Sequence, residues 1–148
     1  MYRAVLSADM AENATSRKTT ILLADDHREF SATVAGMLRN DFEIVGTVND
    51  GEQLVKASMK LVPDVVIVDI SMPVLNGIEA AEQLSRLGNT AKVIFLTIHA
   101  DADFVRACLD AGAAGYVVKS QVAMDLVPAI RQALAGKIFV SHDASLDN

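Results

Sequence analysis

The 148-residue sequence contains one cysteine, three prolines and no tryptophan. What the sequence lacks excludes several classes of protein. A single cysteine, Cys108, excludes an internal disulfide and paired-thiolate zinc spacing, and its apolar neighbours predict a small residue on a buried helix face. No apolar run reaches the ~18 residues of a membrane span, and the first residues have too short an apolar stretch for a secretory signal. A formal net charge of −6 argues against a broad surface for nucleic acid or anionic membranes. We therefore expect a cytoplasmic protein that binds neither nucleic acid nor membranes directly.

Hydrophobic residues make up 51% of the chain and charged residues 22%, which is typical of one globular domain with its own core. Residues 1–18 are small and polar without a sustained period, so they predict a flexible N-terminal extension. The regular pattern covers residues 19–140 and predicts the folded domain. Residues 141–148 are expected to form a tail or the start of a linker.

Short apolar runs rich in Val and Ile predict strands at residues 20–24, 43–48, 64–68, 92–97 and 115–118. Amphipathic segments of helix length lie between and after them, at residues 28–40, 51–61, 77–88, 101–112 and about 125–135. Strict alternation of strand and helix predicts an α/β domain with a parallel sheet and helices on both faces.

The apolar runs also suggest where each strand lies in the sheet. The runs "ILLA", "VVIV" and "VIFL" are continuous, as in strands buried on both faces, so these three should be central. The runs "EIVGTV" and "GYVV" contain Gly or polar positions and suit the edges. Pro128 would remove a backbone hydrogen bond from the interior of a helix, so we expect the last helix to begin with Asp125 as its N-cap.

Polar side chains follow four of the predicted strands. Asp25 and Asp26 follow the first, Asp69 follows the third, Thr97 ends the fourth, and Lys119 follows the fifth. In an open parallel sheet, ligands bind beyond the carboxyl ends of the strands. Each of these residues alone is more often a helix cap, a strand former or a surface charge. Their placement at the same end of four strands predicts a shared site.

Three carboxylates in one pocket need a positive partner, and a hard divalent cation with oxygen ligands supplies one. Lys119 would add an ammonium group and Thr97 a hydroxyl group. A metal ion, an ammonium group and a hydroxyl group around one carboxylate form a receptor for a phosphoryl group. A carboxylate can also act as a nucleophile and become an acyl phosphate.

Four motifs, "LLADDH", "VVIVDISMPVLNGIEA", "VIFLTIHAD" and "AGAAGYVVKS", resemble those of response-regulator receiver domains of two-component systems. The resemblance covers about residues 19–140, and the motif sequences are similar to those of the NarL/FixJ branch, whose members carry a helix-turn-helix effector domain. It implies a flavodoxin-like (βα)5 fold with a five-stranded parallel sheet of order 2-1-3-4-5. It also implies a phosphorylation-dependent switch, not an enzyme, that accepts a phosphoryl group from a sensor histidine kinase.

The same resemblance implies a role for each residue of the site. Asp69 would be the phosphoacceptor, and Asp26, Asp69 and the backbone carbonyl of Ser71 would ligate Mg²⁺, or Mn²⁺ in its place. Asp25 would act through a metal-bound water. Lys119 would pair with a phosphoryl oxygen, Thr97 would donate its hydroxyl group to another, and Tyr116 would turn inward as Thr97 moves.

Three further residues flank these positions. Ile98 is bulky where many receivers have a small residue, so it could narrow the access of small phosphodonors. His99 could overhang the site, although a solvated loop position is the better expectation. His27 follows the two acids, and we expect its side chain to point away at the start of the first helix.

The residues after the last predicted helix are too few for a helix-turn-helix domain, so we expect no DNA-binding domain in this chain. The chain would then be either the regulatory module of a longer transcription regulator or a single-domain receiver that acts through protein contacts, with a homodimer formed on phosphorylation as one candidate. A third interpretation is a Mg²⁺-dependent phosphatase that forms an aspartyl phosphate. Ser71 disfavours this interpretation, because such enzymes carry a second acid two residues after the nucleophile. A pseudo-receiver is the weakest reading, because all the acids and the lysine are present.

Overall fold

The computed structural model describes residues 17–142 and residue 144. Six strands form one sheet in the order β2-β1-β3-β4-β5-β6, and every neighbouring pair is parallel. The strands are β1 (Thr20–Ala24), β2 (Glu43–Val48), β3 (Val65–Val68), β4 (Lys92–Thr97), β5 (Gly115–Val118) and β6 (Phe139–Val140). The helices are α2 (Arg28–Leu38), α3 (Gly51–Leu61), α4 (Gly77–Arg86), α5 (Ala102–Asp110) and α6 (Val122–Leu134).

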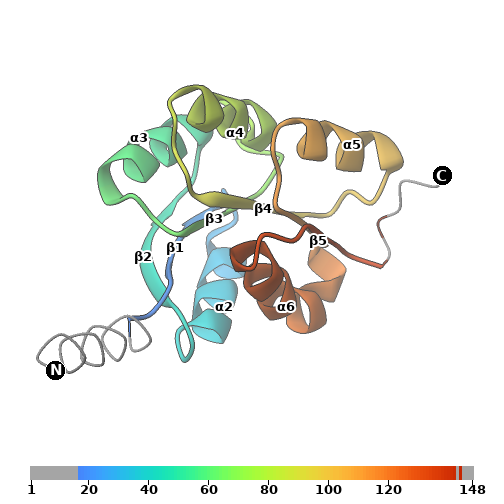
Figure 1. The fold of residues 1–148 in the computed structure, drawn as a ribbon, viewed down its shortest axis with the longest axis horizontal. Coiled ribbons are helices and arrows are strands. Elements are labelled where there is room, and N and C mark those ends of the chain that lie inside the picture. Colours follow the sequence, from blue (N-terminus) through green and yellow to red (C-terminus); the bar gives the residue numbers. More distant parts are fainter. Residues whose placement is uncertain (1–16, 143, 145–148) are drawn as a thin grey trace, which may run out of the picture.

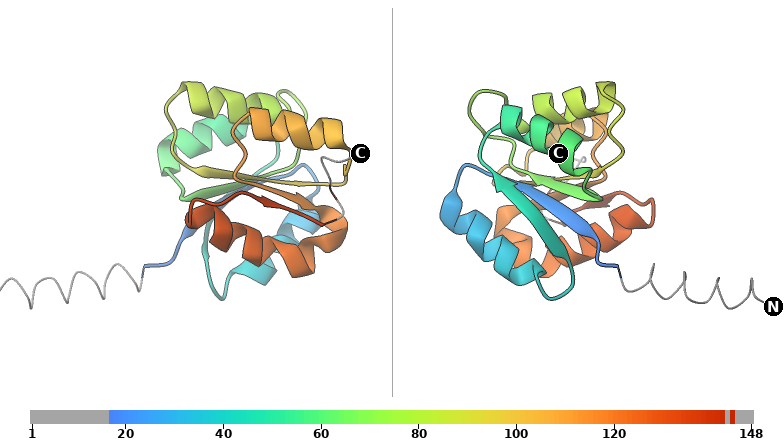
Figure 2. Two further views of the ribbon diagram at one scale, coloured as in Figure 1. Left: turned by 45° about the vertical axis from the view of Figure 1, so that its right-hand side comes forward. Right: turned by 90° about the vertical axis from the view of Figure 1, so that its left-hand side faces the viewer.

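The elements form three layers, with α3, α4 and α5 on one face of the sheet and α2 and α6 on the other (Figures 1 and 2). Each face has its own apolar cluster. Strands β1, β3 and β4 supply fully buried side chains to both clusters, because alternate residues of a strand point to opposite faces. The α/β class, the flavodoxin-like order of the first five strands and the central position of these three strands are thus confirmed.

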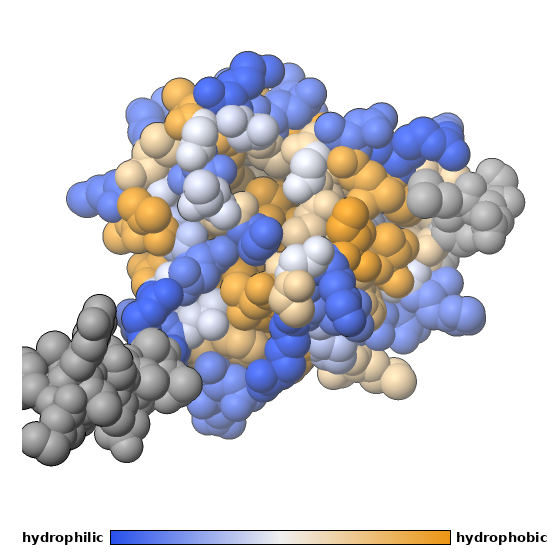
Figure 3. Space-filling view, in the orientation of Figure 1, coloured by the Kyte–Doolittle hydropathy of each residue, from blue (hydrophilic) through white to orange (hydrophobic). Residues whose placement is uncertain are grey.

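The sheet differs from the prediction at one edge. Strand β2 lies at an edge as expected, but β5 does not, because β6 pairs with it through Gly115–Phe139 and Tyr116–Val140. All four residues of β5 are therefore buried. Two residues are too few to carry a strand pattern, which is why β6 was missed. Figure 3 shows apolar side chains gathered below α5, on the right of the view.

The predicted start of the last helix was wrong. A 3-10 turn, η1 (Lys119–Gln121), leads directly into α6 at Val122, and Pro128 lies inside the helix. The Asp125 carboxylate does not cap a helix but accepts a hydrogen bond from the Ser141 hydroxyl group at 2.8 Å. Burial of Leu126, Ala129, Ile130 and Ala133 along one stripe outweighs the backbone hydrogen bond that Pro128 removes.

In the part of the chain that the structure describes, no helix is both long enough and apolar enough to span a membrane. The predicted extension at residues 1–18 falls almost wholly outside that part.

The first residue of α4 has little room for a side chain. A Cβ atom added to Gly77 would collide with the backbone oxygen of Asp69 and the Cγ1 atom of Val68, whereas one added to Gly36 on α2 would meet nothing within 4 Å. The Gly77 amide also donates to the carbonyl oxygen of Ile70 at 2.9 Å. The close approach of α4 to the end of β3 therefore requires glycine at this position.

We predict that Gly77→Ala lowers the free energy of unfolding by about 1–3 kcal/mol, because the backbone around Asp69 must shift. The matched control, Gly36→Ala, should instead raise it by roughly 0.5–1 kcal/mol, since alanine favours an open helical position. Urea denaturation followed by circular dichroism measures both. Equal effects of the two substitutions would show that α4 does not pack this closely.

Candidate functional site

Asp25 and Asp69 lie side by side because they follow two adjacent strands. The Asp69 amide donates to the carbonyl oxygen of Ala24 at 2.9 Å, which continues the pairing of β1 with β3 by one residue. Asp25 is 8% exposed and Asp69 is 4% exposed, whereas Asp26 projects into solvent. One ligand atom each from Asp25, Asp26, His27 and Asp69 lie within 4.8 Å of one another. The structure thus brings the three predicted acids together.

Lys119 holds the two buried acids. Its Nζ atom lies 2.9 Å from Oδ2 of Asp25 and 3.4 Å from Oδ2 of Asp69. The ammonium group also lies over the ring of Phe30 in α2, 4.6 Å from the ring centroid. Sequence reasoning did not identify Phe30, since an apolar residue on the inner face of a helix looks like an ordinary core residue.

Burial raises the pKa of the Asp69 carboxyl group above its ordinary value, because the charged form loses hydration. The charge of Lys119 acts in the opposite direction, and the charge of Asp25 adds to the rise. The net effect is a raised pKa, so the ammonium group does not fully compensate for placing two carboxylates in one poorly hydrated pocket.

The expectation that His27 points away from the acids was wrong. Its Nδ1 atom lies 3.1 Å from Oδ1 of Asp25 and 3.2 Å from Oδ1 of Asp26, and 4.0 Å from Oδ2 of Asp69. His27 precedes α2 with an extended backbone, and its amide donates to Oδ1 of Asp25 at 2.8 Å. This hydrogen bond draws residue 27 back toward the acids, which its position in the sequence alone did not reveal.

The remaining predicted residues lie on or just after β4 and on β5, and they differ in burial. Thr97 is fully buried, and its Oγ1 atom accepts a hydrogen bond from the His99 amide at 3.2 Å. Tyr116 is fully buried in the inward orientation, and its hydroxyl group donates to the carbonyl oxygen of His99 at 2.7 Å. The His99 ring stacks on Phe104 of α5, with a centroid separation of 4.1 Å. Ile98 is 73% exposed.

Ser71 lies in the loop after the predicted phosphoacceptor and is exposed. Its amide donates to Oδ1 of Asp69 at 3.3 Å, so this loop orients the Asp69 carboxylate. The two oxygen atoms of Asp69 thus have different partners, the Ser71 amide on one side and the Lys119 ammonium group on the other.

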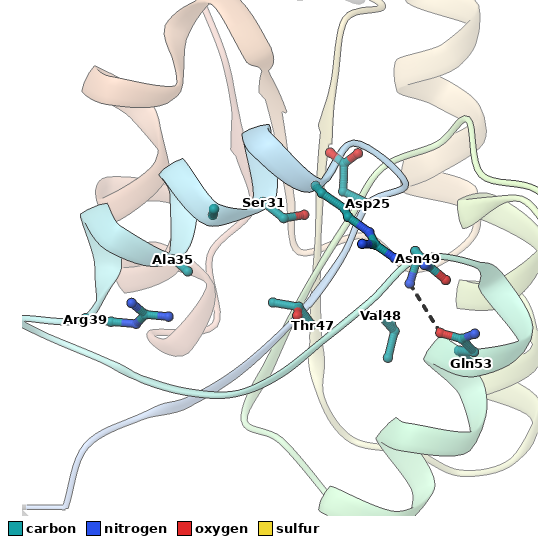
Figure 4. Close-up of a pocket in the computed structure, with 10 residues that line it drawn as sticks. Asp25, Ser31, Ala35, Arg39, Thr47, Val48, Asn49 and Gln53 are labelled. Atoms are coloured by element: carbon teal, nitrogen blue, oxygen red, sulfur yellow. Dashed lines mark hydrogen bonds between the residues drawn. The ribbon is translucent and has the colours of Figure 1, made fainter.

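A separate cavity of about 430 Å³ lies between α2 and β2. Figure 4 shows that Asp25 borders it, with the carboxylate pointing away from Thr47 and Asn49. The cavity thus shares Asp25 with the acid cluster, but Asp69 and Lys119 do not line it.

The fold and the site define a class of protein: a doubly wound α/β domain with an acidic cluster and a lysine beyond the carboxyl ends of its strands. Residues 21–131 match the response regulator receiver domain family, so the chain belongs to that family. Similarity to the regulators named below places it in the NarL/FixJ branch, which confirms the resemblance seen in the sequence.

Among curated proteins, the chain is 35% identical over 133 residues to the transcriptional regulatory protein DegU of Brevibacillus brevis, covering 88% of this chain and 56% of DegU. It is 35% identical over 123 residues to the response regulator GacA of Pseudomonas aeruginosa, covering 82% and 58%. Among solved structures, a LuxR-family two-component response regulator from Aurantimonas sp. SI85-9A1 is 29% identical with a TM-score of 0.82, covering 86% of this chain and 93% of that one. The chain spans a little over half the length of the two curated relatives.

Asp69 gives the site a testable effect on stability. The pKa of Asp69 is higher in the folded than in the unfolded protein, so the ionised carboxylate destabilises the folded state at neutral pH. The folded state becomes more stable as the pH falls through this raised pKa and the carboxylate takes up a proton. We predict that, with EDTA present, Asp69→Asn melts at a higher temperature than wild type near pH 7. The difference should shrink as the pH falls toward the ordinary value of 3.8.

The control is Asp103→Asn, because the Asp103 side chain is 99% exposed and this substitution should leave the melting temperature nearly unchanged. A melting temperature of Asp69→Asn equal to or below that of wild type near pH 7 would contradict the assigned cost of the buried charge.

Proposed function

We propose that Asp69 accepts a phosphoryl group from a sensor histidine kinase and that the phosphorylated domain acts as a signalling switch. The observation that carries the proposal is the Asp69 carboxylate itself, which is nearly buried and is flanked by Lys119 at 3.4 Å and by a second acid. A carboxylate so placed is poorly hydrated, and desolvation favours nucleophilic attack.

In the transfer step, a carboxylate oxygen of Asp69 attacks phosphorus and the bond between phosphorus and the kinase imidazole nitrogen breaks. The electron pair of that bond returns to the nitrogen, and the product is an aspartyl phosphate. Lys119, whose ammonium group now bridges Asp25 and Asp69, is in position to pair with an oxygen of the transferred group. Phe30 and η1 hold Lys119 in place for this role.

The donor set of the acid cluster fits a magnesium ion. Asp25, Asp26 and Asp69 offer carboxylate oxygens within 4.8 Å of one another, and Asp26 is open to the solvent that supplies the water ligands of Mg²⁺. In the proposed assignment, Asp26, Asp69 and the backbone carbonyl of Ser71 ligate the ion directly, and Asp25 acts through water. When bound, the ion neutralises negative charge on the phosphoryl oxygens. Mn²⁺ has similar ligand preferences and is the proposed substitute.

The switch would work through Thr97 and Tyr116. The Thr97 hydroxyl group would turn to donate to a phosphoryl oxygen, which breaks its contact with the His99 amide. The carbonyl oxygen of His99 holds the Tyr116 hydroxyl group, and the His99 ring packs on α5. A change at Thr97 therefore reaches the face formed by α5, β5 and α6, where we place the contact with output partners. Ile98 and His99 would tune the access of phosphodonors.

The names of the relatives favour a regulatory role in transcription over an enzymatic one. We propose that residues 19–140 are the receiver module of such a regulator, with residues 1–18 as an extension and residues 141–148 as a tail or linker. Homodimer formation on phosphorylation fits this role. The phosphatase alternative is disfavoured because Ser71 provides no acid or base two residues after Asp69.

We predict that phosphoramidate with Mg²⁺ adds one phosphoryl group to the wild-type protein and none to Asp69→Asn. Intact-mass spectrometry measures the product. Asp103→Asn serves as a control that should be labelled like wild type. Equal labelling of wild type and Asp69→Asn would exclude Asp69 as the acceptor.

We also predict that Mg²⁺ stabilises the unphosphorylated protein, because the ion binds the folded acids and not the unfolded chain. At about 100 times the dissociation constant, linkage gives roughly 2.7 kcal/mol. Asp26→Ala should abolish the effect in thermal melts, whereas Asp103→Ala should keep it. If Mg²⁺ does not change the melting temperature of the wild-type protein, the acids do not form a metal site.

A further inference from the structure

His27 extends the acid cluster with a nitrogen atom. Its Nδ1 atom is near three carboxylates at once, at 3.1 Å from Asp25, 3.2 Å from Asp26 and 4.0 Å from Asp69. The His27 side chain is 67% exposed, so the ring is held at the cluster by these contacts and not by burial.

The spacing of these atoms matches a coordination sphere. In an octahedral site with metal–ligand bonds of about 2.1 Å, neighbouring donor atoms lie about 3.0 Å apart and opposite donors about 4.2 Å apart. The two shorter separations of Nδ1 fit neighbouring positions, and the separation from Asp69 fits an opposite position. The three separations from Nδ1 are thus those expected if His27 shares an ion with these carboxylates.

Lys119 leaves the donor atoms of Asp25 and Asp26 accessible, but it contacts Oδ2 of Asp69 at 3.4 Å, the atom that lies 4.0 Å from Nδ1 of His27. It contacts Oδ2 of Asp25, whereas His27 approaches Oδ1 of Asp25 and Oδ1 of Asp26. The ammonium group and the imidazole ring thus occupy different sides of the Asp25 carboxylate. An ion placed among Asp25, Asp26 and His27 would not have to displace Lys119 from Asp25.

We propose that His27 is a nitrogen ligand that makes this site select divalent transition-metal ions, such as Co²⁺ or Cu²⁺, more strongly than three carboxylates alone would. Imidazole is a good ligand for such ions, while Mg²⁺ strongly prefers oxygen and gains little from it. His27 therefore sets the ratio of transition-metal to Mg²⁺ affinity. The inference rests on the proposed function only in that both use Asp25, Asp26 and Asp69.

The test compares Co²⁺ and Mg²⁺ binding by isothermal titration calorimetry at about pH 8, where a free imidazole is neutral. His27→Ala should weaken Co²⁺ binding by about tenfold or more, the scale expected when a metal site loses an ordered partner, and should change Mg²⁺ binding less than about twofold. His27→Asn should behave in the same way and guards against a folding defect, because any residue here keeps the backbone hydrogen bond to Asp25. His142→Ala controls for weak binding by an exposed histidine.

Pulsed electron paramagnetic resonance of bound Cu²⁺ gives a second readout that does not depend on affinity. Coupling to a directly bound nitrogen should be present in wild type and His142→Ala and absent in His27→Ala. Equal Co²⁺ affinity with and without His27 would overturn the inference, and so would tighter Mg²⁺ binding by His27→Ala, which would show that the ring competes with metal. In either case the proposed function remains supported as long as the protein binds Mg²⁺. If the wild-type protein binds neither Co²⁺ nor Mg²⁺, both the inference about His27 and the proposed metal site are excluded.

Discussion

Two nearly buried carboxylates share one ammonium group, and the rest of the site depends on that arrangement. Lys119 lies 2.9 Å from Asp25 and 3.4 Å from Asp69, yet the pKa of Asp69 remains raised. The pocket therefore carries an uncompensated negative charge that a cation relieves. The sheet brings the two acids together by placing β1 beside β3, and the Phe30 ring together with η1 keeps the lysine between them. The charged Asp69 carboxylate therefore lowers stability at neutral pH, and its poor hydration is what the proposed role as a nucleophile requires.

A short series of contacts connects this pocket to the face of α5. The Thr97 hydroxyl group accepts from the His99 amide, the His99 carbonyl accepts from Tyr116, and the His99 ring stacks on Phe104. All three contacts involve His99, so a movement of Thr97 that shifts the His99 backbone would reach both Tyr116 and Phe104. Strand β6 adds a further connection, because the Ser141 hydroxyl group accepts from the Val118 amide, next to Lys119. Ser141, which follows β6, is thus hydrogen-bonded to the residue that precedes Lys119.

The sequence predicted those features that repeat along the chain or follow from strand ends. The five main strands, the placement of the acids at one edge and the central strands of the sheet all follow from the apolar runs. Features set by single tertiary contacts were missed. The Asp125 carboxylate bonds Ser141 instead of capping a helix, Phe139–Val140 is too short to show a strand period, and His27 turns toward the acids because its own amide bonds Asp25. No local pattern encodes such contacts.

The central claim is that Asp69 becomes an acyl phosphate, and chemical trapping tests it most directly. Sodium borohydride reduces an aspartyl phosphate to homoserine but leaves free carboxylates intact. After treatment with phosphoramidate and Mg²⁺, borohydride reduction and peptide mass spectrometry should locate homoserine at position 69 alone. Homoserine at position 25 or 26, or no homoserine in protein that has gained a phosphoryl group, would contradict the account.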